Sequence, residues 1–147
     1  KGYTYSPRSS ISSRRSGSYW LQTADVTTEV TGASLTEIFG EIERLRAEPP
    51  SIEELVGIQN YVAGVQLMRG ATSHGLIGVL SFLDLHVLDE AWAEAFVERV
   101  YAVTPNELQS VVIDHLRPEE MTIAIAGDAE KIKGQIEVFG RIERDSD

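Results

Sequence analysis

The chain has 147 residues, of which 42% are hydrophobic and 24% are charged. This balance is typical of a globular domain with a core, and it excludes disordered, collagenous and low-complexity chains. The formal net charge of −10 disfavours binding to nucleic-acid backbones. No cysteine is present, which excludes disulfides, thiolate metal sites and cysteine nucleophiles. The longest apolar stretch, residues 75–83, is far shorter than the about 20 residues that a membrane-spanning helix requires.

The first 20 residues are basic, since Lys1, Arg8, Arg14 and Arg15 occur there without any acid. Such a cluster suits an anionic partner or a peptide carboxylate, but a solvated hairpin tip is the simpler explanation, because short charge clusters usually belong to the surface. The chain begins at Lys1 without a methionine or a signal-peptide pattern, so we expect a processed chain or a fragment of a longer protein. The sequence does not determine the compartment, and the bacterial periplasm and the cytoplasm both fit.

The N-terminal region predicts an antiparallel hairpin. Residues 1–10 are expected to be extended, with Pro7 limiting any strand to an edge or an end. Residues 9–17 are rich in serine and arginine and end in glycine, which indicates a loop. Residues 18–28 alternate as a strand does, with Trp20 on one face and Leu21 on the other.

The middle of the chain predicts helices. An apolar stripe over residues 35–45 indicates a helix that begins at a capping box of Ser34 and Glu37, with Thr31 as a competing cap. Ser51 and Glu54 form a second capping box, for a helix that extends to about residue 69. Further helices are predicted from a Thr72 or Ser73 cap through Leu83, and from an Asp89 cap through Val100.

The segment Thr104-Pro105-Asn106-Glu107 is the strongest local signal, because it combines a cap, an N-terminal proline and a closing glutamate. Residues 121–126 alternate in the manner of a short strand. Gly127-Asp128 then turns the chain into a last helix, which Gly140 ends. The order of strands and helices predicts an α+β fold, in which several helices pack on one face of an antiparallel sheet.

No complete active site is apparent from the residues alone. His74, His86 and His115 do not have the spacing of a metal-binding motif, and each is more simply a structural histidine. The numerous serines lie outside any Gly-x-Ser-x-Gly motif. We therefore expect no cofactor and no metal site within this chain.

Several segments together resemble the pitrilysin/insulinase family of zinc metallopeptidases, which includes mitochondrial processing peptidase. The segments that carry the resemblance occur in the family's order and cover about residues 1–140; they are Lys1-Gly2-Tyr3-Thr4-Tyr5-Ser6, Gly17-Ser18-Tyr19-Trp20-Leu21, 35–45, 51–55, 103–108, 115–119 and 125–128 with its following helix.

The resemblance implies the second half of the family's C-terminal domain, which carries no zinc. Residues 1–140 would be this partial domain, lacking its first strands and helix, and residues 141–147 a charged tail. The zinc site, His-x-x-Glu-His plus a distal glutamate, would lie in another domain of the parent protein. Tyr5 matches a family tyrosine that contacts the bound peptide, whereas the arginine that precedes it by seven residues would fall before Lys1.

The resemblance implies that the parent hydrolyses peptide bonds and that this chain lines the substrate chamber, with Tyr5 in contact with the peptide. This chain alone would be inactive. The expected partners are a peptide or protein substrate, the N-terminal zinc-binding domain or a homologous subunit, and a second copy through self-association. The alternative is a non-catalytic homologue that acts in assembly or partner binding.

Overall fold

The structure is a computed structural model that describes residues 1–144. It contains a two-stranded antiparallel sheet and a series of helices, which confirms the mixed α+β composition. In chain order the elements are β1 (Arg8–Arg14), β2 (Gly17–Thr23), η1 (Thr28–Val30), α1 (Thr31–Ala47), α2 (Ile52–Gly70), α3 (Ser73–His86), α4 (Glu90–Glu94), α5 (Phe96–Ala102), α6 (Pro105–His115), η2 (Pro118–Glu120), α7 (Ala129–Ile136) and η3 (Glu137–Phe139). Among residues 1–144, no helix is long and apolar enough to cross a membrane.

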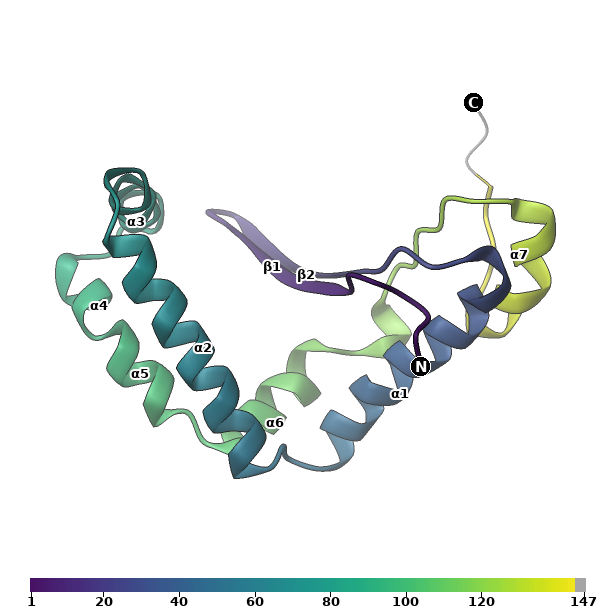
Figure 1. The fold of residues 1–147 in the computed structure, drawn as a ribbon, viewed down its shortest axis with the longest axis horizontal. Coiled ribbons are helices and arrows are strands. Elements are labelled where there is room, and N and C mark those ends of the chain that lie inside the picture. The colour runs from purple at the N-terminus through teal and green to yellow at the C-terminus, as the bar shows by residue number, and fades with distance from the viewer. Residues whose placement is uncertain (145–147) are drawn as a thin grey trace.

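The helices form two arms that meet at an angle, and the hairpin extends across the space between them (Figure 1). One arm contains α1, α6 and α7, and we call the other arm, α2 to α5 (residues 52–102), the helical wing. The chain passes between the arms at Pro49-Pro50 and again at Val103-Thr104. Proline cannot continue a helix, so the first junction directly follows from the sequence.

The arm of α1, α6 and α7 has a small core of Ile42, Val112 and Ile132, one residue from each helix. Its end is fixed by Arg46, whose guanidinium donates to the carbonyl oxygens of Ile113 and Leu116 at 3.1 and 2.9 Å. These bonds satisfy carbonyls at the C-terminal end of α6 that have no partner within the helix. The arm is therefore held by apolar packing and by side-chain capping together.

The helical wing has a second small core, formed by Leu55 and Ala63 of α2 and Leu83 of α3. The buried side chain of Gln59 links α2 to the end of α5, where its amide donates to backbone carbonyls. Phe82 and Trp92 lie 5.5 Å apart between ring centroids and join α3 to α4. The two cores are separate, which fits the two-armed shape.

The hairpin confirms the predicted antiparallel pairing but corrects its boundaries. Residues 9–17 were expected to form a loop, whereas β1 runs through Arg8–Arg14, and β1 and β2 pair from Arg8 opposite Thr23 to Arg14 opposite Gly17. The serines of β1 satisfy their backbone groups in the ladder with β2, and this pairing outweighs their turn-forming preference. The expected strand at the start of the chain is reduced to one bridge, Thr4 opposite Val26.

The capping boxes of Ser51 with Glu54 and of Thr104 with Glu107 are both confirmed, as are the Thr72 and Asp89 caps. The predicted start of the first helix is wrong. That helix begins at Thr31 after an N-cap at Val30 that makes no side-chain cap bond, and the Ser34 hydroxyl donates to the Val30 carbonyl instead. The preceding turn η1 already sets the helical direction, so a side-chain cap is not needed to start it.

Two further predictions need correction. Residues 121–126 form no strand, because among residues 1–144 β1 and β2 pair with each other and offer this segment no partner. A strand without a neighbouring strand leaves its backbone groups unpaired and is not stable by itself. The helix expected from Asp89 through Val100 is divided into α4 and α5 by a turn at Ala95.

The last predicted features lie at the C-terminus. Helix α7 follows an Asp128 cap, and Gly140 (φ 149°) ends the short turn η3 after it, in a conformation that favours glycine. The predicted tail has no regular secondary structure over residues 141–144, and residues 145–147 lie outside the described part.

The two capping boxes predict a pH dependence of stability. The carboxylates of Glu54 and Glu107 accept hydrogen bonds from the backbone N–H groups of Ser51 and Thr104 at 3.0 and 2.9 Å. These bonds lower the pKa of both carboxyl groups. A carboxyl whose pKa is lower in the folded than in the unfolded state stabilises the fold above the unfolded pKa, about 4.3, and this contribution is lost as the pH falls through the folded value.

We therefore expect Glu107→Gln to lose less of its free energy of unfolding than the wild type does when the pH falls from neutral to below about 4. Urea denaturation across this range measures the difference. Glu119→Gln is the control, since Glu119 is an exposed glutamate outside a capping box. Parallel curves for Glu107→Gln and the wild type would contradict the assignment.

Candidate functional site

Tyr5 lies at the base of the hairpin, immediately after the bridge between Thr4 and Val26. Its side chain is 101% exposed, and its hydroxyl has no hydrogen-bond partner among residues 1–144. The neighbouring Tyr3 is only partly exposed. The phenol of Tyr5 is therefore free to donate to an incoming group, and no neighbouring side chain fixes its position.

A groove of about 260 Å³ lies beside this segment, between the first residues and α1. Tyr3, Thr4, Val26, Ser34 and Glu37 contribute to its walls, and Tyr5 does not line it. The Thr4 hydroxyl is buried without a hydrogen-bond partner among the described residues. The groove thus offers polar groups next to Tyr5 without being a closed pocket.

An ion pair fixes the first residue over the end of this groove. The Lys1 Nζ atom lies 2.7 Å from Glu37 Oε1 of α1. The hydrogen bond to Glu37, with its charge, raises the pKa of Lys1. Both side chains are largely exposed, so the pair contributes little to stability but orients the N-terminal segment along α1.

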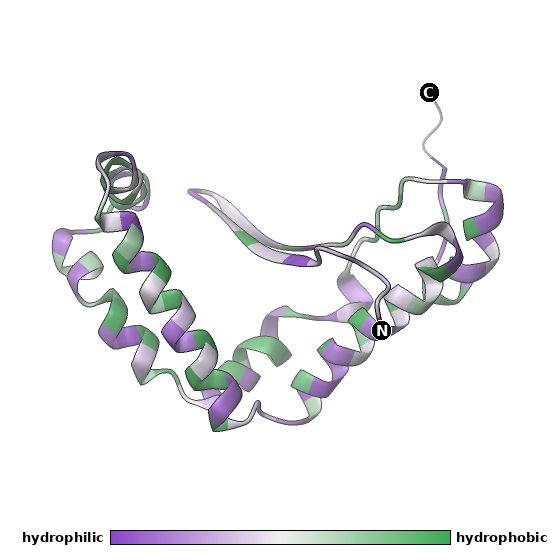
Figure 2. Cartoon of the chain, viewed as in Figure 1, coloured by the Kyte–Doolittle hydropathy of each residue, from purple (hydrophilic) through white to green (hydrophobic). Residues whose placement is uncertain are grey.

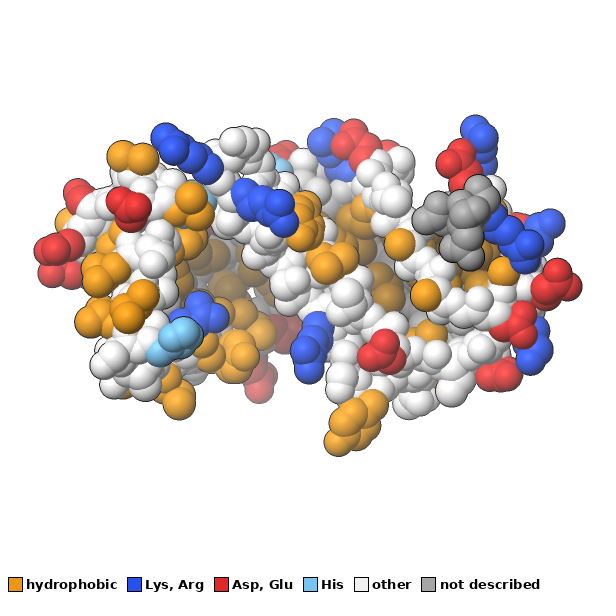
Figure 3. Space-filling model, turned by 90° about the horizontal axis from the view of Figure 1, so that it is seen from above, with side chains coloured by type: hydrophobic (Ala, Val, Ile, Leu, Met, Phe, Trp, Pro, Cys, Tyr) orange, Lys and Arg blue, Asp and Glu red, His pale blue; other side chains and the backbone are white. Residues whose placement is uncertain are grey.

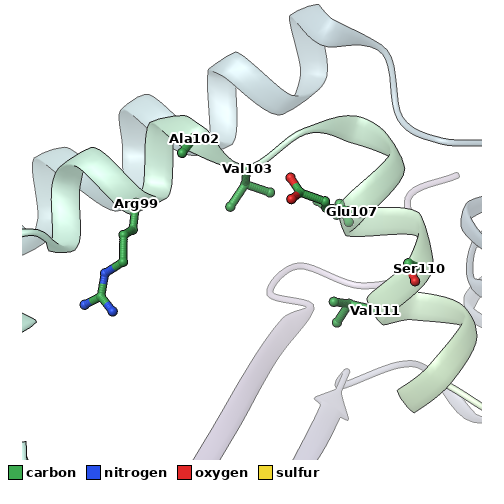
Figure 4. A pocket seen from close by; sticks show the side chains of 7 residues that line it. Arg99, Ala102, Val103, Glu107, Ser110 and Val111 are labelled. Carbon is green, nitrogen blue, oxygen red and sulfur yellow. The ribbon is translucent and has the colours of Figure 1, made fainter.

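A larger concavity of about 650 Å³ lies where α5 meets α6, in the angle between the two arms (Figure 4). Val103, Leu108 and Val111 give it an apolar floor, and Arg99 stands at one side. Glu107 also lines it, but its carboxylate is engaged by the Thr104 cap at 2.8 Å. Sequence reasoning missed this concavity, because its shape depends on the angle between two helices rather than on a motif.

The described residues contain no assembled nucleophilic site. The Ser13 hydroxyl and His86 Nε2 are 3.5 Å apart, at the limit of a hydrogen bond and at an exposed place. No carboxylate among residues 1–144 is hydrogen-bonded to His86, so the pair lacks the third group that orients a catalytic base. His86 instead packs on Phe82, with ring centroids 4.4 Å apart.

The three histidines do not lie together, as the ligands of one metal ion would. His74 and His86 lie at opposite ends of α3, and His115 ends α6. Over residues 1–144, no three His, Asp or Glu side chains converge on one point.

We expect the isolated chain to bind no stoichiometric zinc, because a tight zinc site needs three or four converging ligands. Elemental analysis of protein purified without a chelator measures this directly. One tightly held zinc per chain would contradict the prediction.

Comparison of the chain with protein-family models, with curated proteins and with solved structures finds no match.

Proposed function

We propose that this chain is the zinc-free C-terminal part of a pitrilysin/insulinase-type zinc metallopeptidase, in which it lines the substrate chamber and contacts the peptide. The observation that carries the proposal is the exposure of Tyr5. The residue that the resemblance assigns to substrate has a free hydroxyl at the end of an extended segment. A phenol in this position can donate a hydrogen bond to a peptide carbonyl.

The surroundings of Tyr5 support a role with extended peptides. The outer edges of β1 and β2 have no strand partner among residues 1–144, and an extended peptide can add to such an edge through main-chain hydrogen bonds. Segment 121–126 has strand-type residues and is also unpaired. In the proposed parent, additional strands would complete a sheet with these segments and place several helices on one of its faces.

The chemistry assigned to this chain is limited to binding and orientation. Tyr5 would donate to the carbonyl of the bound peptide, and the bond would strengthen as negative charge develops on that oxygen. The zinc-activated water and the general base would be supplied by the parent's other domain.

The test uses the longer gene product. The sequence upstream of Lys1 and that of the neighbouring gene are read for His-x-x-Glu-His, and the assembled protein is assayed on an unstructured peptide with and without a chelator. Chelator-sensitive hydrolysis that is lost when the glutamate of this motif is changed to glutamine supports the proposal. An assembled protein with the motif that hydrolyses no peptide contradicts it.

One observation favours the alternative, a non-catalytic homologue that acts in assembly. Twenty-four large apolar side chains are exposed among the described residues, against five that are buried, as expected of a chain built to be covered by partners. Absence of His-x-x-Glu-His from both genes, together with a stable complex of their products, would support this function over the peptidase.

A further inference from the structure

The chain exposes more surface than a compact monomer of its size. Its accessible surface is 11332 Å² at a mass of 16.2 kDa. A compact monomer of this mass exposes about 7,500 Å², so the excess is roughly 3,800 Å². Permanent homodimers bury about 2,000–5,000 Å² in total, so covering half of this excess on each of two copies gives an interface of ordinary size.

Much of the uncovered apolar surface lies on α2 and α3 of the helical wing. Leu76, Ile77, Leu80 and Leu85 are 48%, 61%, 51% and 46% exposed, and only Leu83 of α3 is buried. Figure 2 shows that α3 is hydrophobic around much of its circumference. A helix of this composition is normally buried on all sides, whereas among residues 1–144 α3 packs mainly against α2 and α4.

The hairpin is basic, whereas the helical wing is acidic. Residues 8–23 contain three arginines and no acid, whereas residues 52–102 contain seven acids and two arginines. The acids of the wing are Glu53, Glu54, Asp84, Asp89, Glu90, Glu94 and Glu98. Figure 3 shows hydrophobic side chains gathered at the end of the molecule that holds the wing, with acidic groups at its outer edge and basic groups on the surface between this end and the middle. The two surfaces are complementary in charge.

The basic face of the hairpin points away from its own wing. Opposite residues of an antiparallel pair share one face, which places Arg8 and Arg14 together with Tyr19 and Leu21. The guanidinium of Arg14 lies 5.7 Å from the centroid of the Tyr19 ring, in agreement with this. The hairpin touches α3 of its own chain through Ser13, which is on the other face.

Direct pairing of two β1 edges is disfavoured by the same arginines. The strand reads Arg-Ser-Ser-Ile-Ser-Ser-Arg, so an antiparallel pair centred on Ile11 would place Arg8 of one copy opposite Arg14 of the other at both ends. Like charges at opposite positions destabilise strand pairing. The face of the hairpin, rather than its edge, is therefore the surface available to a second copy.

We propose that two copies form a reciprocal dimer, in which the basic face of each hairpin covers the exposed apolar and acidic surface of α2 and α3 of the other copy. Tyr19 and Leu21 contact the apolar side chains of α3, and Arg8, Arg14 and Arg15 lie near Asp84 and the acids of α4. A two-fold axis relates both contacts, so the assembly closes at two chains. The inference concerns this chain alone and is independent of the peptidase proposal.

Sedimentation equilibrium of the 147-residue chain tests the proposal. We expect a dimer whose dissociation constant rises about tenfold or more when the salt concentration is raised from about 0.05 M to about 0.5 M, because salt screens the charge pairs. Arg8→Glu/Arg14→Glu/Arg15→Glu should weaken the dimer at least as much. Lys131→Glu/Lys133→Glu/Arg141→Glu is the matched control, since it makes the same change in net charge far from the hairpin. A wild-type monomer, or equal weakening by both variants, overturns the proposal.

A second experiment exchanges the charges of the two surfaces, so that a variant that fails to fold cannot produce the expected result. Asp84→Lys/Glu90→Lys/Glu94→Lys makes the wing basic, so this variant and the hairpin variant should each be largely monomeric. Mixed together they should form a heterodimer, because each hairpin then meets a wing of opposite charge. Circular dichroism verifies that both variants are folded. Folded variants that do not associate when mixed overturn the proposal.

Discussion

Replacing Gln59 with leucine should lower the free energy of unfolding by about 3 kcal/mol, one of the largest effects expected of a single substitution in the helical wing. Gln59 is 6% exposed, and its amide Nε2 donates to the carbonyl oxygens of Val100, Tyr101 and Val103 at 3.0, 3.4 and 3.0 Å. The carbonyls of Tyr101 and Val103, at and just after the end of α5, accept no other hydrogen bond among the described residues, whereas that of Val100 also accepts from the Val103 N–H at 3.4 Å. Leucine fills a similar volume but leaves the carbonyls of Tyr101 and Val103 unpaired, at about 1–3 kcal/mol for each acceptor that water cannot reach.

Urea denaturation measures this effect, and Gln66→Leu provides the matched comparison. Gln66 lies two turns further along α2, is only half-buried and makes no hydrogen bond among the described residues. Its replacement should change the free energy of unfolding by less than about 0.5 kcal/mol. If Gln59→Leu and Gln66→Leu are equally stable, the link between α2 and the end of α5 is not a stabilising one.

Helix starts could be predicted where the signal lies within one turn. The capping boxes of Ser51 with Glu54 and of Thr104 with Glu107 are formed by residues three apart, so neither depends on the rest of the fold. The start of α1 could not be predicted in this way. There the turn η1 and the contact with α7, through the bond from Gly32 N–H to the Gln135 side chain at 3.1 Å, fix the helix.

Strands were harder to predict than helices, because each strand depends on a distant partner. Residues 121–126 have the alternation of a strand but no strand beside them. Residues 8–14 look like a loop in isolation and form β1 because β2 pairs along their whole length. The sequence pattern shows that a segment can form a strand, and pairing with another strand decides whether it does.

The candidate site, like the strands, depends on residues that are distant in the sequence, so local patterns do not predict it. Tyr5 could be singled out only through the family resemblance, because an exposed tyrosine has no local motif. The groove beside it combines residues 1–7 with residues 22–26 and 34–38, and the concavity at α5 and α6 depends on the angle between these helices. The spacing of residues in the sequence predicts neither the groove nor the concavity.

In the proposed peptidase, Tyr5→Phe should lower turnover by roughly tenfold to a hundredfold while changing peptide affinity much less. The hydroxyl is the only group removed, and it has no intramolecular partner among residues 1–144, so the substitution has no stabilising bond to disrupt. Loss of one donor to a developing oxyanion costs about a hundredfold or more in acyl-transfer enzymes. The lower end of the range applies where a metal ion already polarises the same carbonyl.

Tyr3→Phe is the control for this substitution, since it removes the same hydroxyl two residues away from a partly buried ring that lines the neighbouring groove. Steady-state kinetics on one peptide then separate the two effects. A fall in kcat with little change in KM for Tyr5→Phe alone assigns the hydroxyl to the transition state, because an interaction made equally in the bound substrate would raise KM instead. Wild-type turnover in both variants, or a loss of activity that parallels a loss of folded protein, would remove Tyr5 from the substrate site.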